Sequence, residues 1–231
     1  MIDHYDWAGG REAMLRFGPD TGPVVVAALP LFEEANRTRA FVVTILRQLA
    51  ERGIASALPD LPGQGESLVP LETVRIMQMR DAYQAAVDSF ERPAYALGIR
   101  SGVLLDTLAL INGRWHFAPQ DGAELLRELK RIRQTATREA LGDSWWAAED
   151  VTEIGGNRLS IDLLSGLTCI SPFEETDQVV LRTVRLDSDP RPADLKLPGA
   201  PLWRRAEPDN DPALAALLAD DIAAWVRACE S

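Results

Sequence analysis

The sequence predicts an α/β protein whose central sheet is mostly parallel, with helices on both faces. The run 24–29 is continuously apolar, as expected for a strand that is buried on both faces of a sheet, and the runs 54–58 and 94–97 are further mainly apolar strands. Stretches with apolar residues at helical spacing alternate with these runs, which is the order of a doubly wound fold. With 231 residues, of which 46% are hydrophobic, the chain is long enough for one large domain, and we expect that domain to span 1–231.

The first half of the chain alternates strands and helices. Phe41, Ile45 and Leu49 recur at helical spacing, and Gly53 is placed to end that helix. A Gly/Pro-rich turn over 59–67 separates the next strand from the next helix. The expected elements are an edge strand over 13–17, a strand over 24–29, a helix ending near Gly53, a strand over 54–58, a helix over 72–90 and a strand over 94–97.

The second half continues the pattern with one irregular segment. A helix is expected directly after the strand 94–97, and Asp121 can cap a later amphipathic helix. The segment of about 142–176 is the least regular, with a hairpin-like turn at Gly155 and Gly156, and we expect it to form a short lid. The other expected elements are a strand over 114–119, a helix over 122–141, a strand over 178–186 and a terminal helix from 211 or 212 to about 229.

Composition excludes several classes of function. A formal net charge of -11 argues against binding to nucleic acid or to an anionic membrane. Cys169 and Cys229 make neither a disulfide framework nor a metal site, and we expect both to be small buried residues. The N-terminus lacks the pattern of a signal peptide, and no apolar run is long enough to cross a bilayer. We therefore expect a cytoplasmic protein without a cofactor, which could form a homodimer.

The most informative stretch is Gly98-Ile99-Arg100-Ser101-Gly102, which follows a strand. It has the layout of a nucleophile elbow, G-x-Nu-x-G, in which glycines allow close approach around a strained central residue. Arg100 holds the central position, and its guanidinium stays protonated and cannot act as a nucleophile. A shifted register that centres Ser101 puts larger side chains where small ones are needed. The motif therefore predicts the scaffold of a hydrolase without its usual nucleophile.

Five stretches in consistent order over most of the chain form a recognisable set: 30–39, 58–67, 98–102, 115–119 and 153–160. The most distinctive pair are the E-E-x-N-x-x-R loop and the G-x-R-x-G elbow. Together these stretches resemble the α/β-hydrolase-like proteins associated with the exosortase A system, of the type called hydrolase 2, in which a glutamine is more typical at the position of His116. The resemblance implies an α/β-hydrolase fold and a cytoplasmic protein that works beside exopolysaccharide and protein-sorting machinery in Gram-negative bacteria.

A hydrolase of this fold needs a nucleophile, an acid and a histidine. The acid could be Asp187 or Asp189, which follow a predicted strand. The loop near the C-terminus where the histidine is expected contains none, and the chain's two histidines are His4 and His116. An unconventional catalytic group of Ser101, His116 and Asp187 remains one alternative. In that reading His116 acts as a base, whereas a packed residue at the end of a strand is the other reading.

A second catalytic version places Asp60 or a lid residue beside Ser101 and His116. We also weigh Glu33, Glu34 and Asp60 as a metal cluster, but no histidine or cysteine accompanies them, and we expect no metal. The sequence leaves three functions open. They are a degenerate member that binds an anionic molecule or a partner, an active ester or thioester hydrolase, and a scaffold without catalysis.

Arg100 itself is open to two readings. A guanidinium at the start of a helix would make a bidentate site for a carboxylate or phosphate. Alternatively, Arg100 pairs with Glu33 or Glu34 and locks two loops together. The residues expected to line such an anion site are Arg100, Ser101, Phe32, Glu33, Glu34 and Asn36.

Overall fold

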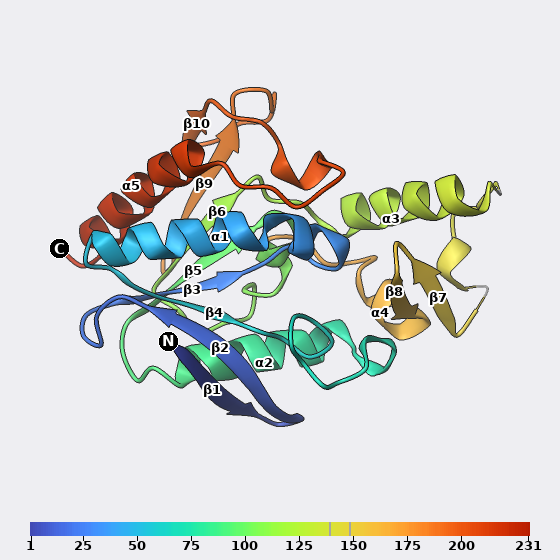
Figure 1. Ribbon diagram of the computed structural model, residues 1–231, viewed down its shortest axis with the longest axis horizontal. Coiled ribbons are helices and arrows are strands. Elements are labelled where there is room, and N and C mark those ends of the chain that lie inside the picture. The colour runs from blue at the N-terminus through green and yellow to red at the C-terminus, as the bar shows by residue number, and fades with distance from the viewer. Residues whose placement is uncertain (139, 148) are drawn as a thin grey trace.

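The computed structural model describes residues 1–138, 140–147 and 149–231, and its centre is one twisted sheet (Figure 1). The sheet consists of β1 (Ile2–Trp7), β2 (Gly10–Phe17), β3 (Val24–Ala28), β4 (Ala55–Pro59), β5 (Ala94–Ile99), β6 (Gly113–Phe117), β9 (Val180–Leu186) and β10 (Leu195–Leu197). The strand order is β1-β2-β4-β3-β5-β6-β9-β10. β2 runs antiparallel to both β1 and β4, and the other neighbouring pairs of this sheet are parallel. The predicted, mostly parallel sheet is thus confirmed.

Helices cover both faces of the sheet. Figure 1 shows α1 (Glu33–Glu51) and α5 (Pro212–Cys229) side by side on one face and α2 (Ile76–Asp88) on the other. The central strands β3, β4, β5 and β6 are buried along their whole length, because each strand faces a hydrophobic core on both sides. This arrangement confirms the doubly wound fold.

The strand order places a candidate site at one edge of the sheet. The chain leaves β3 through α1 to reach β4 on one side, and it returns through α2 to β5 on the other side of β3. The carboxyl ends of β3 and β5 therefore form a topological switch point, where ligands bind in open α/β sheets. The loop over 29–32 and residue Arg100 lie at this point.

The helix expected after β5 is absent, and that prediction is wrong. Only a short 3₁₀ segment, η2 (Arg100–Leu104), follows the strand, and residues 100–112 form the whole crossover to β6. The physical reason is a buried polar cluster. Arg114 in β6 donates to the carbonyls of Asp106 and Ala109, and the Asp106 carboxylate lies 2.9 Å from His116. These bonds bring the chain back to β6 before a helix can extend.

The segment after β6 builds one end of the molecule. Asp121 accepts a hydrogen bond from the backbone N–H of Glu124 and caps α3 (Gly122–Thr137), as predicted. The turn at Gly155 and Gly156 joins β7 (Val151–Ile154) to β8 (Asn157–Ser160), and α4 (Ile161–Gly166) follows. Part of the expected helix 122–141 and of the lid 142–176 lies outside the described residues, at positions 139 and 148.

Several expectations at the edges were wrong. The strand expected at the edge over 13–17 is inside the sheet, because β1 pairs along its outer side. Tyr5 is the one buried side chain of β1, so its sequence carries no apolar alternation. Cys169 and Cys229 are exposed, since they lie in a turn after α4 and at the last residue of α5.

Helix boundaries also shifted slightly. The stretch expected as one helix over 72–90 divides into a 3₁₀ segment, η1 (Leu71–Thr73), and α2. The terminal helix follows its prediction, with Asp211 capping α5. Across the described ranges, the apolar stretches within the helices fall short of what a bilayer crossing requires.

Candidate functional site

Arg100 occupies a strained position at the end of β5. Its φ of 54° lies in the left-handed region that non-glycine residues rarely adopt. Gly102 packs so closely that a Cβ there would lie 2.3 Å from the carbonyl oxygen of Ala28, and a Cβ on Gly98 would lie 2.8 Å from Val103. The geometry is that of a nucleophile elbow, with an arginine in place of the nucleophile.

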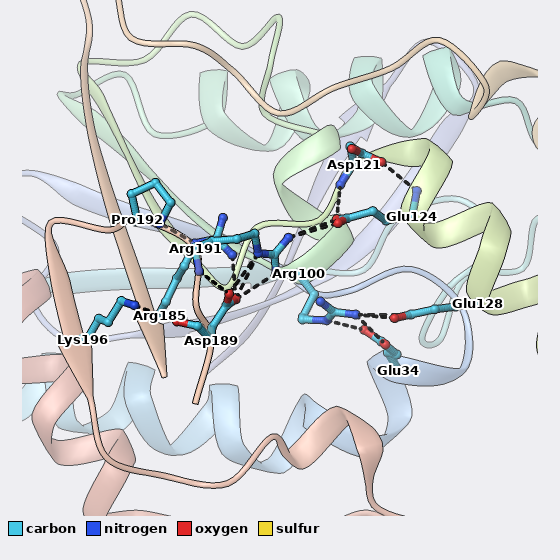
Figure 2. Close-up of polar contacts among 10 residues, drawn as sticks. All are labelled: Glu34, Arg100, Asp121, Glu124, Glu128, Arg185, Asp189, Arg191, Pro192 and Lys196. Carbon is cyan, nitrogen blue, oxygen red and sulfur yellow. Dashed lines mark hydrogen bonds and ion pairs between the residues drawn. The ribbon is translucent and has the colours of Figure 1, made fainter. Parts of the chain in front are cut away.

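The guanidinium of Arg100 is held by two carboxylates (Figure 2). Its Nε and Nη2 donate to Glu34 of α1 at 3.2 and 3.3 Å, and Nη2 also donates to Glu128 of α3 at 3.1 and 3.2 Å. The same group lies 4.9 Å from the ring centre of Trp203, a cation–π distance. The pairing of Arg100 with Glu34, which the sequence left open, is therefore present. Arg100 is only 5% exposed, and it acts as a clasp that joins the elbow to α1 and α3.

One carboxylate of the clasp titrates near neutral pH. Burial raises the pKa of Glu34, Arg100 opposes the shift and the neighbouring Glu128 adds to it, so that the pKa of Glu34 lies at about 7. Glu34 therefore loses its proton as the pH rises through about 7.

Ser101 is not free to attack a substrate. Its side chain is fully buried, and its Oγ accepts a hydrogen bond from the backbone N–H of Leu31 at 2.9 Å. In hydrolases with a nucleophile elbow, an N–H of the loop after the corresponding strand helps to stabilise the oxyanion. Here the backbone N–H of Leu31 already donates to the hydroxyl oxygen of Ser101.

The proposed catalytic group is not assembled. His116 is buried with its Nε2 2.9 Å from Asp106 Oδ2, inside the polar cluster that also holds Arg114. Asp187 is exposed beyond the end of β9. Among the residues with described positions, no hydrogen bond joins any two of Ser101, His116 and Asp187. His116 is thus a packed polar residue of a strand, which was the alternative reading.

The other candidate acid belongs to an arginine network beside the clasp. Asp189 accepts hydrogen bonds from Arg185 and Arg191, and these bonds hold its pKa far below the ordinary value. Arg191 reaches Glu124 as well, at 3.1 Å, which connects the loop after β9 to α3 (Figure 2). A carboxylate that is bound so tightly by arginines is a poor partner for a catalytic histidine.

The side chains of the loop after β3 and of the start of α1 mostly contact other parts of the protein and leave few groups for binding a ligand. Phe32 is buried, with a left-handed φ of 61°, and Glu33 pairs with Arg37 one helical turn later. Asn36 is exposed on α1. The six residues expected to line an anion site are therefore near one another in the chain and the fold, but Glu33 and Glu34 are both engaged by arginines.

The carboxylates weighed as a metal cluster all have cationic partners. Asp60 is buried and accepts from Arg39 at 2.9 Å, in addition to the pairs of Glu33 and Glu34 described above. Over the described ranges, no group of three or more histidine, cysteine, aspartate or glutamate side chains is arranged to hold a metal ion.

A polar cavity of about 200 Å³ lies next to the clasp. Within the described part of the chain, no ion pair engages Arg127, Arg131 or Arg204, and all three are exposed. Gln120 is 1% exposed, and neither of its amide atoms has a hydrogen-bond partner among the residues with described positions. The cavity is lined by Arg100, Gln120, Glu124, Arg127, Glu128, Arg131, Arg191 and Arg204.

Sequence reasoning missed this cavity, although part of the signal was present. Glu124, Arg127, Glu128 and Arg131 have the spacing i, i+3, i+4 and i+7, so they share one face of the predicted helix. The tertiary fold, and not the helix pattern, places this face in the same cavity wall as Arg100 and Arg204.

An apolar groove of about 250 Å³ adjoins the polar cavity. It shares Glu128, Arg131 and Arg204 with that cavity, so one mouth offers both an apolar and a cationic surface. The 3₁₀ segment η4 (Leu202–Arg204) closes one side. The apolar side chains of the groove are Leu31, Phe32, Leu125, Leu129, Ile132 and Trp203.

Several solved structures match this chain over nearly its whole length at low sequence identity. Est1E from Butyrivibrio proteoclasticus with bound ferulic acid is 16% identical, with a TM-score of 0.64 over 97% of this chain and 98% of that one. A haloalkane dehalogenase variant, DbeA-M1 from Bradyrhizobium elkanii, is 13% identical, with a TM-score of 0.63 over 100% and 97%. The bottromycin epimerase BotH, solved with bottromycin A2, is 13% identical, with a TM-score of 0.58 over 99% of each chain.

At these identities the similarity establishes the α/β-hydrolase fold alone. No family model matches the chain, and no curated protein matches its sequence.

Proposed function

We propose that this α/β-hydrolase-fold chain binds an anionic small molecule at the mouth beside Arg100 and does not hydrolyse it. The observation that carries the proposal is a group of three arginines around one cavity, Arg127, Arg131 and Arg204, none of which has an ion-pair partner among the described residues. Guanidinium groups bind carboxylates and phosphates in bidentate geometry. In a chain with a net charge of -11, three neighbouring arginines that no described carboxylate engages favour a ligand of opposite charge.

The state of the elbow supports binding without hydrolysis. Arg100 stands where the nucleophile belongs, and Ser101 and His116 are each bound to other groups. A serine without an adjacent base has little nucleophilicity. The receptor for the anion is thus the arginine rim, while Arg100 positions α1 and α3 around it.

We also propose that the chain acts in the cytoplasm, beside exosortase and exopolysaccharide machinery. The support is the resemblance of its motifs to the exosortase-associated family. The two most distinctive of those motifs meet in one ion cluster, because Glu34 belongs to the E-E-x-N-x-x-R loop and Arg100 to the elbow.

A thermal-shift screen with inorganic phosphate and small carboxylates tests the binding. We expect phosphate to raise the melting temperature of the wild type and to have little effect on the triple variant Arg127→Gln/Arg131→Gln/Arg204→Gln. A matched control removes the same charge from exposed arginines elsewhere, at Arg11, Arg75 and Arg158. Loss of the shift in both variants, or no shift in the wild type with any anion, would contradict the proposal.

A second candidate is an ester or thioester hydrolase, which the apolar groove favours because an acyl chain could lie in it. A panel of p-nitrophenyl esters and thioesters separates the two functions. The binding proposal expects no turnover above background in the wild type. Turnover that Ser101→Ala abolishes would establish the hydrolase instead.

A further inference from the structure

The side-chain amide of Gln120 lies in the wall of the polar cavity. Gln120 follows β6, and its backbone N–H donates to the carbonyl oxygen of Arg100 at 3.4 Å, which ties it to the elbow. The side chain is 1% exposed, yet neither Oε1 nor Nε2 has a hydrogen-bond partner among the residues that the structure describes. Buried amides are almost always hydrogen-bonded, because an unmade bond costs free energy. A ligand that enters the cavity is placed to supply the missing bonds.

The chemistry of an amide restricts what that ligand can be. Gln120 offers one acceptor, Oε1, beside two donors on Nε2. A carboxylate or a fully ionised phosphate has acceptors only, so it would leave Oε1 without a partner. Two neighbouring hydroxyl groups can donate to Oε1 and accept from Nε2 at the same time.

The same cavity carries the arginine rim. Gln120 lies within its wall together with Arg127, Arg131 and Arg204, which have no carboxylate partners among the described residues. Its volume of about 200 Å³ is below the roughly 300–1,000 Å³ of pockets for drug-sized ligands. The space therefore suits one small hydroxylated ring or chain with an anionic group.

We infer that the ligand is a hydroxylated anion, such as a sugar phosphate or a sugar acid, whose hydroxyl groups bind Gln120 while its anionic group binds Arg127, Arg131 and Arg204. The inference rests on the proposed anion binding and adds the class of the ligand. Gln120 selects for hydroxyl groups, and the arginines supply the charge-dependent part of the affinity.

Calorimetric titration with four probes tests the inference: glucose 1-phosphate, glucuronate, inorganic phosphate and glucose. For the wild type we expect at least one of the two hydroxylated anions to bind about tenfold more tightly than inorganic phosphate, because paired hydrogen bonds discriminate strongly. Gln120→Met, which keeps a similar volume without the amide, should abolish that preference and retain the binding of inorganic phosphate. The triple arginine variant should lose the binding of every anion.

Melting temperatures of the same variants separate the loss of a ligand contact from the loss of folded protein. Gln120→Met should melt at or above the wild-type temperature, because it removes an unpaired polar group. A lower melting temperature would show that the amide is structural and would overturn the inference. Gln120→Asn, which keeps the amide but shortens its reach, should lower the preference without lowering the melting temperature.

The outcomes separate the two proposals. Equal affinity for inorganic phosphate and both hydroxylated anions, or a preference that survives in Gln120→Met, would overturn the inference while anion binding stands. If no anion binds the wild type, the proposed function itself is wrong, and the inference falls with it.

Discussion

At the scale of single residues, the clasp around Arg100 follows from the cost of burying charge. A guanidinium that is 5% exposed must be paired, and Glu34 and Glu128 provide the pairing from two different helices. The arrangement gives Arg100 no capacity to bind a ligand with its own fork. It also means that the two carboxylates depend on Arg100 as much as Arg100 depends on them.

Replacing Arg100 should therefore destabilise the fold strongly. We expect Arg100→Met to lower the free energy of unfolding by about 3 kcal/mol at pH 8, because it leaves the largely buried Glu34 and the partly exposed Glu128 without a counter-charge. Arg127→Met is the control, because Arg127 is an exposed arginine of the same cavity that no described carboxylate engages, and it should change the free energy of unfolding by less than about 0.5 kcal/mol. Urea unfolding measures both, and equal effects would refute the clasp.

The raised pKa of Glu34 gives the clasp a pH dependence. Glu34 holds its proton in the folded state up to a pH of about 7, whereas an unperturbed glutamate in the unfolded chain releases it at a pKa of 4.5. Stability should therefore fall as the pH rises from about 4.5 to 7 and then level off.

Melting temperatures between pH 4.5 and 8 test this dependence. The decline should be smaller in Glu34→Gln than in the wild type. The exposed Glu207 serves as the control, since Glu207→Gln should follow the wild-type profile. A profile of Glu34→Gln that is parallel to the wild type would contradict the assignment.

The sequence predicted one half of this site. The G-x-R-x-G motif indicated the elbow, and the E-E-x-N-x-x-R loop indicated the partner Glu34, because both are local patterns. Glu128 and Gln120 were not predicted, since their approach to Arg100 depends on how α3 crosses the end of the sheet. No local pattern records whether a buried amide has a partner.

At the scale of elements, close packing shapes the turn after β5. A Cβ on Gly102 would lie 2.3 Å from the carbonyl oxygen of Ala28 and 2.6 Å from that of Leu29. Both contacts are with backbone, which cannot rotate away as a side chain can. The elbow and β3 can therefore meet only through a glycine.

Gly102→Ala should be costly for this reason. We expect a loss of about 1 to 3 kcal/mol or more in the free energy of unfolding, as for overpacked cores. Gly142→Ala is the matched control, since a Cβ at Gly142 would meet nothing within 4 Å. Comparable stability of the two variants in chemical denaturation would show that the turn is looser than described.

Interior and edge elements differ in how far the sequence predicts them. The strands β3, β4 and β5 were predicted because strands buried on both faces are rich in apolar residues along their whole length. β1 and β10 lie at the edges, where few side chains are buried, and the pattern is lost. The missing helix after β5 could not be foreseen, because it depends on the contact of Asp106 with Arg114 and His116.

At the scale of the whole molecule, the mouth of the site carries an excess of positively charged side chains, whereas the chain as a whole is negatively charged. The chain carries a net charge of -11, yet the polar cavity is lined by five arginines and two glutamates. Composition predicted the overall acidity but not this local reversal, because Arg127 and Arg131 come from α3 and Arg204 from a distant segment. Only the fold brings them together.

Anion binding at this mouth should depend on salt. The rim arginines are exposed, and the Debye length falls to about 3 Å in 1 M salt, so screening weakens their attraction for the ligand. We expect the affinity for inorganic phosphate to fall about tenfold between roughly 0.02 and 0.5 M sodium chloride. Titrations at both concentrations measure the change, and an affinity that is independent of salt would contradict electrostatic binding.

The occupied backbone N–H of Leu31 limits what a change at position 100 can achieve. Placing a serine there would not create a serine hydrolase, because Ser101 would still bind that N–H and His116 would still be bound to Asp106. The two carboxylates of the clasp would also be left without their cation. An engineered nucleophile at this position therefore needs compensating changes in α1, α3 and β6 at the same time.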